Sequence, residues 1–161
     1  MKNDTLPAVS LTPTLRPLYT SRIDIAAPLN LGKVPHGQRR IINILGGAFS
    51  GPRLSGRVLP GGADWQIVRG DGIVEVSARY TLETDDGALI HITNRGLRHG
   101  PAEVIRRLGA GEKVDASEYY FRTTPVFETG APEYSWLNGI IAVAAGERRA
   151  DAVIITAYEL T

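Results

Sequence analysis

Hydrophobic and polar residues alternate along residues 74–83, which is the pattern of a β-strand that buries one face. The apolar face, which other parts of the chain must cover, carries Val74, Val76, Ala78, Tyr80 and Leu82. The polar face carries Glu75, Ser77, Arg79, Thr81 and Glu83. This strand lies within residues 54–97, where the pairs Gly61-Gly62, Asp71-Gly72 and Asp86-Gly87 are typical of two-residue hairpin turns. The stretch therefore predicts a meander of antiparallel strands.

Five further segments predict β-strands because β-branched and aromatic residues are frequent in them. They are residues 18–26, 39–49, 119–127, 140–145 and 152–160. Two prolines and two glycines in residues 28–37 predict a loop. One helix is predicted after Gly100, where Pro101 precedes apolar residues at helical spacing and glycines follow.

Many short strands, adjacent hairpins and one helix favour a closed antiparallel sheet over alternating strands and helices. We therefore predict a mainly β fold: a single antiparallel β-barrel of about eight to ten strands over residues 15–161, with one short helix. Residues 1–14 contain two prolines and no periodicity, so we expect a mobile arm or an arm docked on a neighbour. A barrel of about eight strands encloses space that side chains fill or that holds one small ligand.

Composition and charge narrow the classes of function. The chain has 161 residues, no cysteine, and a formal net charge of +1 from 18 basic and 17 acidic residues. Disulfides and thiolate chemistry are therefore excluded, and no single-sign charge pattern indicates a nucleic-acid partner. No apolar run reaches the roughly 20 residues of a membrane helix, and residues 1–14 lack a signal-peptide pattern. We expect a cytoplasmic protein without a membrane partner.

The sequence contains none of the common catalytic or cofactor signatures. Its three histidines, His36, His91 and His99, do not have the spacing of metal ligands. The glycine-rich runs match neither a phosphate loop nor the dinucleotide-binding fingerprint, and no G-x-S-x-G motif is present. We therefore predict no metal and no cofactor.

The turns at Asp71-Gly72 and Asp86-Gly87 predict a register across three strands. If each turn has two residues, Asp64 faces Arg79, and Arg79 faces Asn94. Cross-strand neighbours on one face lie about 5 Å apart, so these side chains would form one polar row. Inside the barrel, Arg79 would bind an anionic or carbonyl oxygen, Asp64 would orient Arg79 or move a proton, and Asn94 would hold the ligand. The alternative is a row on the outer surface, and one bulge would break this register.

Aromatic and polar residues are concentrated in residues 119–139. Amphipathic aromatic side chains beside a few polar groups suit the wall and mouth of a pocket for a planar organic ligand. The residues with this role would be Tyr120, Arg122, Glu128, Tyr134, Trp136 and Asn138. The alternative is a strand and a long loop that aromatic packing fixes to the end of the barrel.

Three long motifs resemble a known family. They are GxxxGPxLxGxVLPGGADW at residues 47–65, ARYTLxTDDG at 78–87 and YFRTTPxFETGxPxYxWLN at 120–138. Over residues 18–160 the chain resembles domain of unknown function 3237, also called uncharacterised protein family 0311. The resemblance implies a compact, oligomeric antiparallel β-barrel found in bacteria and fungi, and no established general activity. Its motif residues include both predicted clusters and add Trp65, whereas Ser77 stands where the family often has an acidic residue.

These observations favour a small-molecule-binding β-barrel. We predict a cofactor-independent enzyme of the isomerase, cyclase or lyase type that transfers a proton on a small aromatic or carbonyl-bearing metabolite. Asp64 and Arg79 would be catalytic, and Trp65, Asn94 and the aromatic cluster would bind the substrate. The alternatives are a binding module without turnover and a structural barrel. We also expect a homo-oligomer, with barrels joined through strand edges in the structural alternative.

Overall fold

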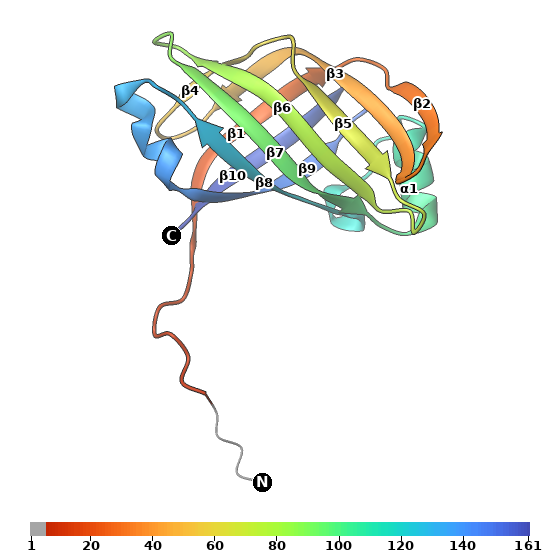
Figure 1. Cartoon of the computed structure of the whole chain (residues 1–161), viewed down its shortest axis with the longest axis horizontal. Helices are drawn as coiled ribbons and strands as arrows, with labels where there is room; N and C mark the ends of the chain where they lie inside the picture. Colours follow the sequence, from red (N-terminus) through yellow and green to blue (C-terminus); the bar gives the residue numbers. More distant parts are fainter. Residues whose placement is uncertain (1–5) are drawn as a thin grey trace.

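Residues 6–161 are described by a computed structural model. In this part of the chain, a single 10-stranded sheet closes on itself because β1 pairs with both β10 and β3 (Figure 1). The strands are β1 (Leu15–Ile25), β2 (Leu29–Val34), β3 (Gly37–Ser50), β4 (Ser55–Val58), β5 (Ala63–Val68), β6 (Val74–Thr84), β7 (Leu89–His99), β8 (Tyr120–Glu128), β9 (Ile141–Arg148) and β10 (Ala152–Leu160). The helices are α1 (Ala102–Gly109) and two short 3-10 helices, η1 (Ala116–Glu118) and η2 (Pro132–Gly139).

The closed barrel has eight antiparallel strand positions. β4 and β5 follow one another between β3 and β6, and β2 pairs only with β3. The predicted mainly β fold and antiparallel barrel are confirmed. The loop predicted at residues 28–37 is wrong, because this segment contains β2. Pro28 and Pro35 lie just outside β2, where a missing N–H removes no bond of the strand ladder.

The remaining predicted elements match the structure closely, apart from the 3-10 helices. The predicted helix is α1, which follows Pro101 and buries Val104 and Leu108. Of the predicted arm, residues 1–5 lie outside the described residues, and residues 6–14 are exposed and form no strand or helix. Thr14 exchanges two backbone hydrogen bonds of 2.8 and 2.9 Å with Thr161. None of the helices in the described residues is long and apolar enough to cross a membrane.

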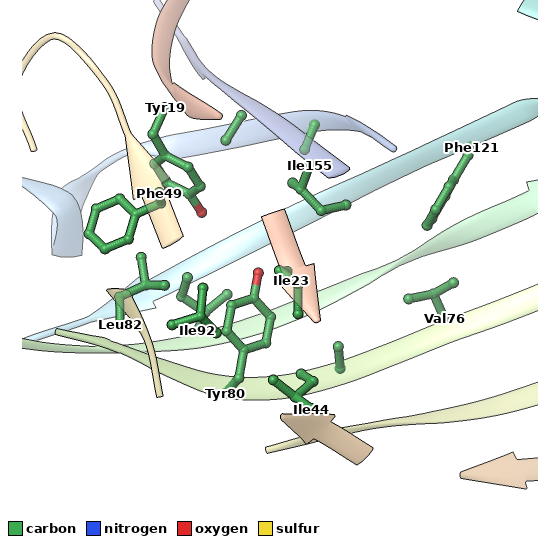
Figure 2. Packing of buried hydrophobic residues seen from close by; sticks show 14 of the residues in the cluster. Tyr19, Ile23, Ile44, Phe49, Val76, Tyr80, Leu82, Ile92, Phe121 and Ile155 are labelled. Carbon is green, nitrogen blue, oxygen red and sulfur yellow. The ribbon is translucent and has the colours of Figure 1, made fainter. Parts of the chain in front are cut away.

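One half of the barrel interior is filled by hydrophobic side chains. The apolar face predicted for β6 is buried. Leu82, at the end of β6 that lies nearest η2, is fully buried. Beside it, the ring of Tyr19 packs edge-to-face on Phe49, with a centroid distance of 5.6 Å (Figure 2). It also packs edge-to-face on Phe127, at 6.2 Å. Leu137 from η2 is also buried in this cluster. Two cavities lie toward the other end, where α1 lies (Figure 1).

Candidate active site

Two three-residue loops set the register around the predicted polar row. In the β5–β6 loop, the Arg69 N–H donates to the Ile73 carbonyl oxygen at 2.9 Å, and residues 70–72 lie between them. The β6–β7 loop, residues 85–87, closes with the equivalent bond, also 2.9 Å long. The last residue of each loop is a glycine, with φ values of 85° and 88°, in the left-handed conformation that such loops require. The predicted two-residue turns at Asp71-Gly72 and Asp86-Gly87 are therefore wrong, because each loop is one residue longer.

The longer loops shift both registers by one residue, so Arg79 pairs with Ala63 and Thr93 and lies on the sheet face opposite to Asp64 and Asn94. Asp64 pairs with Ala78, and Ala78 pairs with Asn94 on the next strand. The predicted row of Asp64, Arg79 and Asn94 is therefore wrong. Asp64 and Asn94 share the inner face with Ala78 between them, and Arg79 lies on the outer face.

Asp64 is a hydrogen-bonded carboxyl group in the barrel interior. Its Oδ2 accepts a hydrogen bond from Gln66 Nε2 at 2.7 Å, and its Oδ1 accepts one from the Ser77 N–H at 2.9 Å. Gln66 Oε1 in turn accepts a hydrogen bond from Arg40 Nη2 at 3.1 Å. Burial raises the pKa of Asp64, and the hydrogen bonds and the charges of Arg98 and Arg40 oppose this rise only in part. Asp64 thus holds its proton to higher pH than a surface aspartate does.

Arg98 projects into the interior from the end of β7 nearest α1. It is 7% exposed, and its side chain forms no hydrogen bond or ion pair with any of the described residues. Its guanidinium lies 5.5 Å from the centre of the Phe121 ring. Burial, together with the positive charges of Arg148 and Arg40, lowers the pKa of Arg98 to about 10. The group remains positively charged at neutral pH, without a partner that satisfies it.

Two neighbouring cavities surround these side chains. A cavity of about 40 Å³, here called the lumen, is lined by Asp64, Asn94 and Arg98 among apolar residues. A wider pocket of about 290 Å³, here called the entrance, lies beside α1. Gln66, Arg98 and Arg148 are among the residues that line both cavities. The entrance and the lumen therefore adjoin at these shared side chains.

Several buried polar atoms of the lumen have no hydrogen-bond partner among the described residues. They are Thr123 Oγ1 and Arg98 Nη1, together with the Tyr80 hydroxyl and Asn94 Oδ1, which lie near each other without a well-formed hydrogen bond. Figure 2 shows the Tyr80 hydroxyl directed into the barrel interior. Burial raises the pKa of Tyr80 far above its usual value, and the nearby Asn94 side chain opposes this rise only in part, so the hydroxyl stays protonated and can donate a hydrogen bond. An unsatisfied buried polar atom costs about 1–3 kcal/mol, and a bound molecule can remove that cost.

Five of the predicted site residues lie on the outer surface and not in the lumen. Arg79 is exposed, and its guanidinium lies 5.1 Å from the centre of the Trp65 ring. Tyr120, Arg122 and Glu128 project outward from alternate positions of β8. The expectation that Tyr120 and Arg122 share one face is confirmed, but that face is the outer one. None of these five side chains is brought together with Asp64.

The three predicted site residues of η2 lie at the barrel end opposite α1 (Figure 1). The Tyr134 hydroxyl donates to the Asp86 carboxylate at 3.0 Å, and the Arg53 guanidinium lies 3.8 Å from the centre of a Trp136 ring. Asn138 exchanges two hydrogen bonds of 2.9 Å with the backbone directly after β8. These contacts fix η2 to the barrel end and keep it away from the lumen. They agree with the alternative given above for residues 119–139, a strand and a long loop fixed to the barrel end by aromatic packing.

Arg98 is a site residue that the sequence analysis does not predict, although the alternation of buried and exposed positions along β7 indicates it. Asn94 and Arg98 have the same two-residue phase as Ile90 and Ile92, which are buried. Arg40 and Arg148 had no comparable signal, because only closure of the barrel brings the ends of β3 and β9 together. In the described part of the chain, no three His, Asp or Glu side chains are grouped so that they could hold a metal ion.

The fold and this interior define a class of protein: a closed antiparallel β-barrel whose lumen is lined by arginines and adjoins a pocket at one end. The chain belongs to the DUF3237 family, described as a protein of unknown function, whose sequence profile matches residues 13–160. The resemblance seen in the sequence motifs is therefore confirmed.

Relatives of known sequence or structure cover nearly the whole chain. A UPF0311 protein of Rhodopseudomonas palustris is 45% identical over 152 residues, which span 93% of this chain and 99% of that protein. The crystal structure of a β-barrel-like protein from Acinetobacter baumannii has a TM-score of 0.84 and 46% identity, and covers 96% of this chain and 100% of that one. The crystal structure of an enzyme from Penicillium herquei has a TM-score of 0.73 at 19% identity and covers 97% and 100%. This last likeness shows a shared fold.

Proposed function

We propose that this barrel is a cofactor-independent enzyme that transfers a proton on a small carbonyl-bearing metabolite inside the lumen. The observation that carries the proposal is Asp64. Its carboxyl group is fixed by two hydrogen bonds, faces a cavity, and has a pKa raised by burial. A carboxyl group with a raised pKa, positioned in a cavity, suits general acid–base catalysis near neutral pH.

The polar atoms around Asp64 supply the other part of this chemistry. Asp64 accepts a proton from a carbon or hydroxyl group of the substrate. The Thr123 hydroxyl, which lacks another partner, and the Tyr80 hydroxyl beside Asn94 donate hydrogen bonds to the carbonyl oxygen as negative charge develops there. Return of the proton from Asp64 to another atom of the same molecule completes an isomerisation or cyclisation, and its transfer to a leaving group completes a lyase reaction.

The proposal replaces one of the residues predicted from the sequence. Arg79 lies on the outer face, and Arg98 is the arginine that lines the lumen with Asp64. The Penicillium herquei protein that shares this fold is called an enzyme, which supports catalysis as a use of such a barrel. The expected partner is a small-molecule ligand, and a homo-oligomer remains a prediction.

Solvent-deuterium exchange tests the proposed function before the substrate is known. The protein is incubated in D₂O with a pooled library of small carbonyl compounds, and mass spectrometry detects compounds that gain a deuterium. We expect a narrow set of compounds to exchange with the wild type and not with Asp64→Asn. Asp71→Asn, in an exposed turn, is the matched control and should exchange like the wild type.

Two results of this experiment would contradict the proposed function. One is equal exchange with the wild type and Asp64→Asn. The other is retention of a library compound by the protein without any exchange or conversion, which would favour the alternative of a binding module without turnover.

A further inference from the structure

The strongest unexplained feature of the interior is an excess of positive charge. Arg40, Arg98 and Arg148 all line the entrance, and Arg98 and Arg148 also line the lumen. Asp64 is the one acidic residue among the described residues that line either cavity. Asp151 is near Arg148, but it is exposed and pairs with Arg22 at 3.1 Å. Three guanidinium groups therefore share one interior carboxylate.

The three arginines differ in how well their own chain satisfies them. Arg148 Nη1 donates to the carbonyl oxygens of Arg149 and of Ala152, the second at 3.3 Å, and Arg40 Nη2 donates to Gln66. Arg40 Nε is buried without a partner, and the Arg98 side chain has no hydrogen bond at all among the described residues. A buried, unpaired charge is costly, and a bound ligand of opposite charge would offset that cost.

We infer that the substrate is a small carboxylic acid whose carboxylate is bound by Arg98 where the entrance meets the lumen, with Arg40 and Arg148 beside it. This inference rests on the proposed function, because it places the substrate at the cavity that Asp64 lines. The planar fork of a guanidinium matches the two oxygens of a carboxylate. A phosphate dianion fits less well, because the ionised Asp64 lines the same small lumen and repels a second negative charge.

The dimensions of the cavities limit the size of this acid. Ligand pockets usually measure about 300–1,000 Å³, and the entrance, at about 290 Å³, lies just below that range. The lumen, at about 40 Å³, has room only for a reactive group of a few atoms. The carboxylate bound to Arg98 would thus place an adjacent carbonyl or hydroxyl group toward Asp64 and Tyr80.

Matched pairs of acids and amides test the inference directly. Benzoate and benzamide, and propionate and propionamide, are titrated into the full-length protein at constant ionic strength, with inorganic phosphate as a third arm. Binding is followed by NMR through the side-chain Nε–H signals of the arginines. We expect saturable binding of at least one acid, and binding of its amide weaker by about tenfold or more, because the amide cannot form a charge-assisted bond to Arg98.

Variants separate Arg98 from the general positive charge of the protein. Arg98→Gln should weaken acid binding by about tenfold or more. Arg57→Gln, at an exposed arginine that pairs with Glu83, is the matched control and should bind like the wild type. Arg148→Gln leaves Arg98 in place and should weaken binding severalfold, so it serves if Arg98→Gln does not fold. Equal binding of acid and amide, unchanged binding by both variants, no saturable binding, or tighter binding of phosphate would each overturn the inference.

Asp64→Asn distinguishes a failure of this inference from a failure of the proposed function. The variant loses the carboxylate that repels the acid, so it should bind the acid at least as tightly as the wild type while it loses deuterium exchange. Exchange that depends on Asp64 without acid binding would overturn only the inference. Acid binding that depends on Arg98, without any exchange that depends on Asp64, would overturn only the proposed function.

Discussion

Asp64→Asn is expected to slow turnover by about 10²–10⁴-fold, the usual contribution of a positioned general acid or base. An amide cannot accept the proton, but it has nearly the shape of the carboxylate, and its oxygen can still accept the Ser77 N–H bond. The loss should therefore fall on kcat, with KM unchanged or lowered. Steady-state kinetics on a compound found by deuterium exchange provides the measurement. A kcat within a few fold of the wild type would exclude Asp64 as the proton-transfer group.

The pH dependence of the same reaction follows from the raised pKa of Asp64. As a base, Asp64 must be ionised, so kcat should fall as the pH drops through that raised pKa. The folded protein also holds the Asp64 proton more tightly than the unfolded chain does. The wild type should therefore lose stability relative to Asp64→Asn as the pH rises above about 4, the usual pKa of an aspartate.

Arg98→Met is expected to stabilise the fold by about 1–3 kcal/mol at neutral pH. Methionine has a flexible apolar side chain that packs against Phe121 and removes a buried charge that has no partner. The same substitution should abolish binding of the acid, so stability and function would change in opposite directions. Urea unfolding of both proteins, with unfolding free energies extrapolated to water, gives the comparison.

Arg57→Met is the matched control for this measurement. Arg57 is exposed and pairs with Glu83 at 2.6 Å, so its substitution should change the free energy of unfolding by no more than about 1 kcal/mol. If Arg98→Met were instead less stable than the wild type by more than the control, Arg98 would be a structural residue and not an unpaired charge kept for a ligand.

The strands and the barrel could be predicted because local patterns determine them. The alternation along β6 identified its buried face, and β-rich segments identified most of the other strands. That same alternation already placed Arg79 on the polar face, opposite Ala78 and Tyr80. The predicted row of Asp64, Arg79 and Asn94 depends instead on the assumption that each turn has two residues. The alternation along β6 is the more reliable guide to the face that Arg79 occupies.

The register could not be predicted reliably because Asp-Gly suits two kinds of loop. It occurs in a two-residue turn, and it also occupies the last two positions of a three-residue loop whose glycine is left-handed. Both hairpins use the second kind, and each moves the pairing by one residue. Arg40, Arg98 and Arg148 come from strands far apart in the sequence, so their convergence becomes visible only when the barrel is closed.

An NMR titration of the Asp64 side-chain carboxyl carbon, assigned by comparison with Asp64→Asn, tests most directly whether the lumen holds a group suited to proton transfer. The predicted result is a titration midpoint above the value of about 3.9 found for an unperturbed aspartate, because burial disfavours the charged form. A midpoint at or below about 3.9 would contradict the proposal, since Asp64 would then behave as an ordinary solvated or ion-paired carboxylate.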